Sequence, residues 1–303
     1  MAVNTNETKR MQMIEMLLSH LPREGVLTST VKGVKLFRID ESFPRTPKAY
    51  DSQIIIMAQG MKRVFLGEQI FTYDPFNYLV LSVPLPIECE AIAQPNEPIL
   101  GLTVSVDPQV VGELLLDMEN APYDAESLPM GIYGAPLTDG MADSVLRLLQ
   151  ALASPADERI LGPMIVREII YRVLCGEHGG ALRALAYRNR RFFQIARVLN
   201  KIHESYDEVL DVRTLAMEAG MSVSTFHSSF KAVTDASPLQ YIKSIRLHKA
   251  RALMTQDGLN AYAAALRVGY ESPSQFSREY KRFYGITPAR DAVSMRNADA
   301  ETA

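Results

Sequence analysis

Two stretches in the last third of the chain carry polar side chains of the types that form hydrogen bonds to DNA. Arg278 is suited to a two-bond contact with guanine, and Gln275 to a two-bond contact with adenine. Lys231 and Lys281 stand at matching positions, where a lysine would contact phosphate and orient the protein without reading a base. The predicted DNA-contacting residues are Ser222, Ser224, Thr225, His227, Ser228 and Lys231 in the first stretch, and Ser272, Ser274, Gln275, Arg278 and Lys281 in the second.

These stretches lie within a repeat whose two copies are about 50 residues apart. Residues 215–221 and 264–270 are each a short, mostly apolar run with a glycine close to its end. In each copy a second run follows, with polar residues on one face. One helix, a glycine turn and a second helix of this kind are typical of a helix-turn-helix, whose second helix enters the major groove. Two such motifs indicate a protein that reads DNA sequence.

The second helix of each motif has a predicted cap and a predicted buried side. Ser222 and Ser272 are expected to cap these helices, because a serine hydroxyl accepts a hydrogen bond from a free backbone amide of the first turn. The predicted core residues are aromatic pairs four positions apart, Phe226 with Phe230 and Phe276 with Tyr280. An ordinary helical bundle with solvated polar faces is the alternative for one motif, and it is much less favoured for two in register.

A single helix is expected to join the two motifs. Residues 238–254 would span about 25 Å as a helix. Successive major grooves on one face of a duplex are about 34 Å apart. Adding a helix radius at each end would therefore place the two reading helices in adjacent grooves.

The charge of the chain is unevenly distributed. The 303 residues carry a net charge of −3, with 47% hydrophobic and 22% charged residues, as in a globular protein. Residues 189–290 hold 15 Lys and Arg against 9 Asp and Glu, so this segment is at +6 and the remainder at −9. A basic segment attached to an acidic remainder fits a nucleic-acid-binding module next to a domain with another task.

Cysteine use and hydropathy favour a cytoplasmic protein. Two cysteines cannot form a disulfide framework. The apolar run at residues 11–18 is interrupted by Gln12 and Glu15, which favours an amphipathic helix over a signal peptide. No apolar run approaches the roughly 20 residues that span a bilayer, so we expect no membrane partner.

The first half of the chain is expected to be rich in short strands. Strand patterns occur at residues 52–60, 64–73, 78–83, 88–93 and 99–106, with a hairpin turn at Gly67. Short strands at this spacing predict a small barrel or sandwich. Helices follow from Asp107, a predicted N-cap, and at residues 139–153 and 156–175. An interdomain joint is placed within residues 176–188, and residues 294–303 are expected to be disordered.

Residues 190–291 resemble the AraC/XylS family of bacterial transcription regulators. The resemblance rests on Gly269-Tyr270-Glu271-Ser272, Phe276-Ser277-Arg278 and the run at residues 283–288. It implies that base-reading positions fall on Ser224, His227 and Ser228, and then on Ser274, Gln275 and Arg278. Ala264 departs from the larger aliphatic residue usual in the family, which implies a looser core in the second motif.

Residues 59–82 also resemble the sensor half of one branch of this family. The relevant runs are at residues 59–63, 66–67, 73–75 and 78–82. The resemblance implies a cupin-like β-barrel that takes a small effector. A metal-dependent cupin enzyme is the rival, but histidines occur only at positions 20, 178, 203, 227 and 248, outside the strand region. We therefore expect no catalytic residue, no metal and no cofactor.

Two alternatives concern the cysteines. Cys89 could line the effector pocket, although the flanking carboxylates of Glu88 and Glu90 would raise the pKa of its thiol and reduce its reactivity. A buried, inert Cys89 is the favoured interpretation, and Cys175 is expected in the core as well.

The predicted fold is α+β, with a cupin-like β-barrel and helices followed by an all-α domain with two helix-turn-helix motifs. Residues 1–180 would sense an effector and support dimerisation, residues 188–291 would bind DNA, and residues 292–303 would form a tail. Expected partners are double-stranded promoter DNA, a small-molecule effector, a second copy of the chain and, as a further candidate, RNA polymerase. The alternative functions are a cupin-type binding protein or enzyme with a helical interaction tail, and a non-specific nucleic-acid binder.

Overall fold

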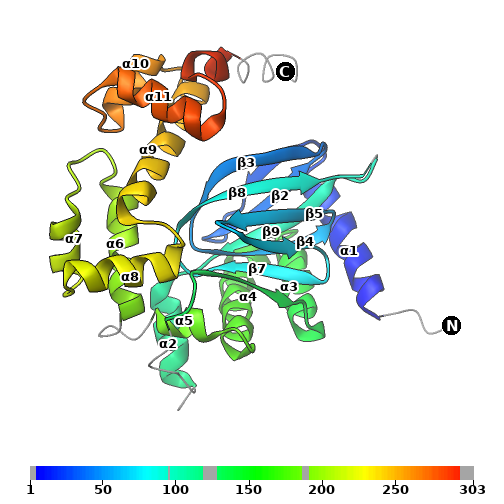
Figure 1. Cartoon of the computed structure of the whole chain (residues 1–303). Coiled ribbons are helices and arrows are strands. Elements are labelled where there is room, and N and C mark those ends of the chain that lie inside the picture. The colour runs from blue at the N-terminus through cyan, green and yellow to red at the C-terminus, as the bar shows by residue number, and fades with distance from the viewer. Residues whose placement is uncertain (1–4, 95, 119–127, 186–190, 294–303) are drawn as a thin grey trace.

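A strand-rich part with supporting helices is followed by a wholly helical part (Figure 1). The computed structural model describes residues 5–94, 96–118, 128–185 and 191–293. The strands are β1 (Gly25–Thr28), β2 (Val34–Ile39), β3 (Phe43–Tyr50), β4 (Gln53–Gln59), β5 (Met61–Leu66), β6 (Gln69–Tyr73), β7 (Asn77–Leu81), β8 (Leu85–Ile92), β9 (Ile99–Ser105) and β10 (Ile132–Pro136). The helices are α1 (Thr5–His20), α2 (Pro108–Asp117), α3 (Asp139–Ala151), α4 (Pro155–Cys175), α5 (Gly180–Ala184), α6 (Arg191–Glu204), α7 (Val212–Glu218), α8 (Val223–Thr234), α9 (Pro238–Thr255), α10 (Ala261–Arg267) and α11 (Pro273–Tyr284). The predicted α+β class is confirmed.

The strands form two antiparallel sheets. The larger sheet has the order β1-β2-β9-β4-β7-β10 and the smaller one the order β3-β8-β5-β6. Among the described strands, no hydrogen-bonded pairing joins one sheet to the other. The strand spacing predicts either a small barrel or a sandwich. The cupin-like domain is a sandwich of two facing sheets and not a closed barrel.

Local pattern predicts the central strands well and the outer ones poorly. The hairpin is confirmed, since β5 and β6 pair from Leu66 and Gln69 outward around Gly67, which has a φ of +58°. The edge strand β10 pairs with β7, but its sequence contains Gly134 and Pro136, which disguise a strand. The edge strand β1 exposes three of its four residues, so it lacks the alternation that would reveal it.

Helices α1, α3 and α4 lie on the larger sheet (Figure 1). Asp107 caps α2 as predicted, because its carboxylate accepts a hydrogen bond from the amide of Gln109 at 3.0 Å. The prediction for Cys175 is wrong, since this residue ends α4 and is exposed. The preceding Leu174 takes the inward position, and the next residue of a helix is rotated by about 100° from it.

Buried apolar side chains form two clusters. The larger cluster is continuous from the strands through α6, α7, α8 and the first half of α9. The smaller cluster belongs to the second half of α9, to α10 and to α11. Helix α9 serves both, with Tyr241, Ile242 and Ile245 in the first cluster and Leu247 and Ala250 in the second.

Two predictions concern the ends and the membrane. The predicted disordered tail at residues 294–303 lies outside the described residues. No helix in the described part of the chain combines the length and the apolar character that crossing a bilayer requires.

Candidate nucleic-acid interface

Both predicted helix-turn-helix motifs are present. Helices α7 and α8 form the first and α10 and α11 the second. The turns pass through Gly220 and Gly269, whose φ values of +65° and +80° lie in the region that favours glycine. In the second turn a β-carbon on Gly269 would also come within 2.5 Å of the carbonyl oxygen of Asp207. Both the backbone conformation and the lack of space therefore favour glycine at this position.

The predicted serine caps form as expected. The hydroxyl oxygen of Ser222 accepts a hydrogen bond from the amide of Thr225 at 3.2 Å. Ser272 does the same for the amide of Gln275 at 3.3 Å. These two hydroxyl groups therefore start the reading helices and are partly occupied by that task.

The first reading helix, α8, presents the predicted polar residues to solvent. Ser224, His227, Ser228 and Lys231 are exposed, and Thr225 is half-buried with its hydroxyl 2.9 Å from that of Ser222. The opposite side is held by the buried rings of Phe226 and Phe230, which lie 5.5 Å apart between centroids.

The second reading helix, α11, has the same organisation and more positive charge. Ser274, Gln275, Arg278 and Lys281 are exposed as predicted, and the exposed Arg282 adds a further cation. Phe276 and Tyr280 are fully buried, with ring centroids 5.5 Å apart. Ala264 in α10 is itself fully buried within this smaller core.

A carboxylate outside the predicted set of residues lies beside Gln275, the predicted adenine reader. Glu279 accepts hydrogen bonds from Gln275 Nε2 at 3.1 Å, from Lys243 Nζ at 2.8 Å and from Tyr270 Oη at 2.8 Å. Burial alone raises the pKa of Glu279, but these hydrogen bonds outweigh it and the pKa lies below its ordinary value. The spacing of Gln275 and Glu279, four residues apart on a helix, was the available signal.

Together these side chains line one groove between α9 and α11. Its walls are Lys243, Gln275, Arg278, Glu279 and Arg282. In this arrangement the amide of Gln275 is engaged by Glu279, whereas Arg278 extends from an exposed position. The two predicted base-reading residues of α11 therefore differ, since Gln275 is engaged by Glu279 and Arg278 is exposed.

The first motif is attached directly to the strand-rich domain. The hydroxyl of Tyr241, near the start of α9, donates a 2.6 Å hydrogen bond to the carbonyl oxygen of Pro84. The amide of Gly131 donates one of 3.0 Å to the carbonyl oxygen of Val233, at the end of α8.

A third contact involves the residue that ends the first reading helix. Asp235 is the C-cap of α8 and has a φ of +54°. A β-carbon added to Gly67 would lie 1.7 Å from its carboxylate oxygen, so the tip of the β5–β6 hairpin is pressed against this cap. The strand-rich domain therefore touches the helix that would read the first groove.

Cys89 is fully buried on β8, as the favoured interpretation predicts. The argument from its neighbours is wrong, however, because Glu88 and Glu90 point to the opposite face of the strand. There they form ion pairs with Arg45 and Arg63. Alternate residues of a strand face opposite sides of its sheet, so these carboxylates do not surround the thiol.

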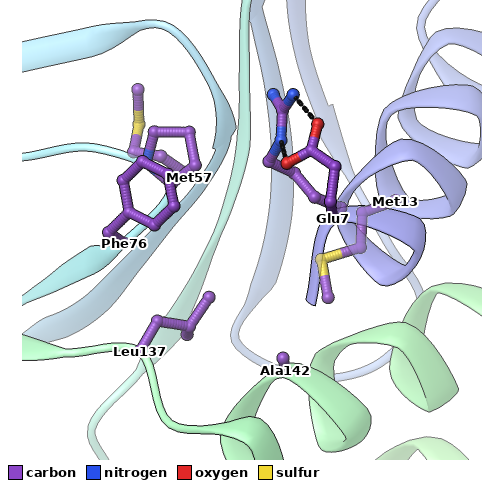
Figure 2. A pocket seen from close by; sticks show the side chains of 8 residues that line it. Glu7, Met13, Met57, Phe76, Leu137 and Ala142 are labelled. Atoms are coloured by element: carbon purple, nitrogen blue, oxygen red, sulfur yellow. Dashed lines mark hydrogen bonds and ion pairs between the residues drawn. The ribbon is translucent and has the colours of Figure 1, made fainter. Parts of the chain in front are cut away.

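A small cavity of about 50 Å³ lies between α1 and the larger sheet (Figure 2). The carboxylate of Glu7 and the guanidinium of Arg10 pair within it, with Arg10 Nε 3.1 Å from Glu7 Oε2. The remaining walls are apolar side chains such as Met13, Met57 and Leu137. Its two charged groups thus satisfy each other. Within the described residues no cluster of three His, Cys, Asp or Glu side chains could hold a metal ion.

Comparison with known families is consistent with this architecture. The family described as AraC-type transcriptional regulator N-terminus matches residues 30–181, and a helix-turn-helix domain family matches residues 215–291. The chain therefore belongs to the AraC-type transcriptional regulators.

Curated relatives include other regulators. HTH-type transcriptional regulator ArgR of Pseudomonas aeruginosa is 26% identical over 164 residues, which are 53% of this chain and 49% of that protein. Virulence regulon transcriptional activator VirF of Yersinia enterocolitica is 24% identical over 194 residues, 64% of this chain and 69% of that protein. A histidine kinase of Formosa agariphila is 25% identical over 259 residues, 81% of this chain but 18% of the kinase. The chain thus spans less than half the length of the kinase and of ArgR.

A solved structure shares the fold over most of the chain. Apo ToxT from Vibrio cholerae superposes with a TM-score of 0.53 at 11% identity, over 90% of this chain and 100% of that chain. The likeness concerns the fold: a sheet domain followed by two helix-turn-helix motifs.

Proposed function

We propose that the chain is a sequence-specific DNA-binding regulator of transcription, controlled by a small molecule in its strand-rich domain. One observation carries this proposal: two helix-turn-helix motifs expose matched polar faces and are joined by the single helix α9. At 18 residues, α9 is about 27 Å long, which suits two readers in successive major grooves.

The two reading helices would contribute differently. Arg278 would make the discriminating contact, since it is exposed on α11 and can form two hydrogen bonds to guanine. Gln275 would have to leave Glu279 before it could pair with adenine. Lys231 and Lys281 would bind phosphates, together with Arg282. On α8, the exposed polar side chains of Ser224, His227 and Ser228 would lie against the other groove.

Control would pass through the contact between the sensor and the first motif. The reading helix α8 ends against the β5–β6 hairpin, and its core is continuous with that of the sheets. An effector that binds better to one arrangement of this contact would shift the population toward that arrangement. The change in the free energy of DNA binding could then be no larger than the difference in effector-binding free energy between the two arrangements.

A second copy of the chain would bind at α4. Ile160, Leu161 and Met164 are exposed there, Ile160 at 62% and Met164 at 65%. Their spacing places them on one face of the helix, where three large apolar side chains are costly to leave in water. A homodimer would cover them and would present four reading helices to a promoter. We place such a regulator in the cytoplasm, where promoter DNA and RNA polymerase are available to it.

Selection from a random DNA library at physiological salt tests this function. The full chain is the right reagent, because α6, α7 and α8 share their core with the sheets and a fragment would expose it. An enriched motif with two blocks about one helical turn apart is the expected result. Binding without any enriched motif would instead identify a non-specific binder. No binding, with or without added small molecules, would favour a binding protein or enzyme whose helices serve another interaction.

A further inference from the structure

The inner face of the smaller sheet carries a set of polar groups that neither the DNA-binding surface nor the hydrophobic core explains. Lys62 on β5 is 6% exposed, and Tyr73 on β6, which pairs with it across the strands, is completely buried. Lys48 and Tyr50 on β3 and Cys89 on β8 belong to the same face. We call these five residues the inter-sheet cluster.

Lys62 is a buried cation without a carboxylate. Among the described residues it forms no ion pair and no hydrogen bond, and its ammonium lies 4.5 Å from the centre of the Phe37 ring on the facing sheet. Burial lowers its pKa to about 8; the neighbouring Cys89 opposes this shift, and the positive charge of Lys48 adds to it. Burying an unpaired ammonium in a protein interior costs on the order of several kcal/mol of folding free energy unless another group compensates the charge.

The glutamates of the same sheet are directed elsewhere. Glu88 and Glu90 flank Cys89 on β8, but both leave the opposite face of the sheet and pair with Arg45 and Arg63. The ammonium of Lys48 lies 4.0 Å from the centre of the Phe43 ring and forms no ion pair among the described residues. The inner face of the smaller sheet therefore carries two lysines. The two glutamates of its strands pair with arginines on the outer face.

Hydrogen-bond donors accompany the two cations. The hydroxyl of Tyr73 is buried beside the Tyr50 hydroxyl and the Cys89 thiol, and among the described residues no partner meets it at normal hydrogen-bond geometry. The hydroxyl of Tyr50 donates a hydrogen bond of 3.7 Å to the sulfur of Cys89 and lies beside the hydroxyl of Tyr73. Buried polar groups are nearly always satisfied, so an unsatisfied donor beside an unpaired cation points to an acceptor that the chain itself does not supply.

We propose that the inter-sheet cluster binds a small organic carboxylate, with its negative group at Lys62 and Tyr73 and its apolar body between the sheets. A carboxylate supplies the single negative charge that Lys62 lacks and accepts the hydrogen bond that Tyr73 can donate. The surrounding inward residues, such as Val64 and Ile87, are apolar and suit a hydrocarbon or aromatic body. That this ligand is the effector rests on the proposed function, whereas its binding does not.

Paired probes of equal shape test the charge requirement. Sodium benzoate with benzamide, and sodium octanoate with octanamide, are added at about 10 mM to the full chain, and the Tm is measured at constant ionic strength. At least one carboxylate should raise the Tm by a few degrees more than its amide. Equal effects of each acid and its amide would overturn the proposal.

Two substitutions locate the site. Lys62→Met should abolish the carboxylate-dependent shift, and Tyr73→Phe should reduce it. Arg63→Met is the matched control, since it removes one positive charge from the adjacent residue of the same strand, on the outer face. It should leave the shift unchanged. A shift that disappears equally in Lys62→Met and Arg63→Met would show surface binding and contradict the site.

The same variants give a readout without ligand. Removing an uncompensated buried charge should raise the Tm of the Lys62→Met chain, whereas Arg63→Met breaks a surface pair and should change it little. A clear fall in Tm on Lys62→Met would mean that the fold already compensates this charge, and it would remove the reason for a ligand. DNA selection by the same proteins separates failure of the site from failure of the proposed function. Carboxylate binding that leaves DNA affinity unchanged would keep the site and reject the effector.

Discussion

The hydroxyl of Tyr241 donates a 2.6 Å hydrogen bond to the carbonyl oxygen of Pro84, 157 residues earlier in the chain. The same hydroxyl lies 2.8 Å from His203 Nε2 on α6. Because the only proton of the tyrosine is used toward Pro84, this histidine nitrogen must be the donor to Tyr241. The helix that joins the two DNA-binding motifs is thus anchored at its start to the turn between β7 and β8.

Tyr241→Phe should destabilise the full chain by about 1–2 kcal/mol, because it leaves the carbonyl of Pro84 and the histidine without their buried partner. Chemical unfolding followed by circular dichroism measures this change. Tyr262→Phe is the control, since Tyr262 is 63% exposed on α10 and should tolerate the loss of its hydroxyl. Equal stability of the two variants would show that the anchor contributes nothing.

Acid should destabilise the chain through two buried histidines before most carboxylates titrate. Burial lowers the pKa of His203 to about 4 and that of His248 to about 3. In the unfolded chain both titrate near pH 6.5, so between about pH 6.5 and 4 the unfolded state binds more protons than the folded state. The free energy of unfolding therefore falls as the pH falls through this window.

Unfolding experiments from about pH 7 to about pH 5 measure that slope while most carboxylates remain ionised. His248→Asn should make the slope shallower. His227→Asn should not, because His227 is exposed on α8. A slope that is the same in both variants would place the responsible protons elsewhere.

Arg278→Ala should relax the preference for one base pair by about 1–3 kcal/mol while other positions of the DNA site keep their discrimination. Competition binding against a panel of single-base variants of the selected motif measures this. Lys281→Ala, one turn from it on the same exposed side of α11, should instead weaken all sequences alike and reduce the salt dependence. If Arg278→Ala weakened binding to all sequences equally, Arg278 would contact phosphate and would not read a base.

Tyr280→Phe should loosen the second motif and leave the first unaffected, because the two have separate cores. The Tyr280 hydroxyl donates a 2.5 Å hydrogen bond to Asp291, which also pairs with Arg251. Removing it should cost about 1–2 kcal/mol locally. Hydrogen exchange should then rise in residues 247–291 and remain constant in α6, α7 and α8.

Phe230→Leu, at the corresponding position of the first motif, is the reciprocal control. Phe230 belongs to the larger cluster, so hydrogen exchange should rise in α6, α7 and α8 and in the strands that share this core. If each substitution raises exchange in both motifs, α9 couples them into one cooperative unit and the separation of the cores has no consequence for stability.

Features that depend on near neighbours were predictable from the sequence alone. Ser222 and Ser272 cap helices because each hydroxyl reaches an amide three residues ahead. The glycine turns, the aromatic pairs on α8 and α11 and the hairpin at Gly67 likewise follow from spacing within one element. The two motifs, the linking helix and the exposed faces were therefore all available from the order of residues.

Only the tertiary structure decided which distant groups meet. Glu279 receives Lys243 from 36 residues away, and this contact occupies the carboxylate beside Gln275. The Lys62 ammonium lies against Phe37 of the other sheet and, among the described residues, forms no ion pair, although the strands of its own sheet contain two glutamates. The sequence determines which face of a strand or helix a side chain takes, because that depends on local periodicity. What lies opposite that face depends on how sheets and helices pack, and packing is decided by the whole chain.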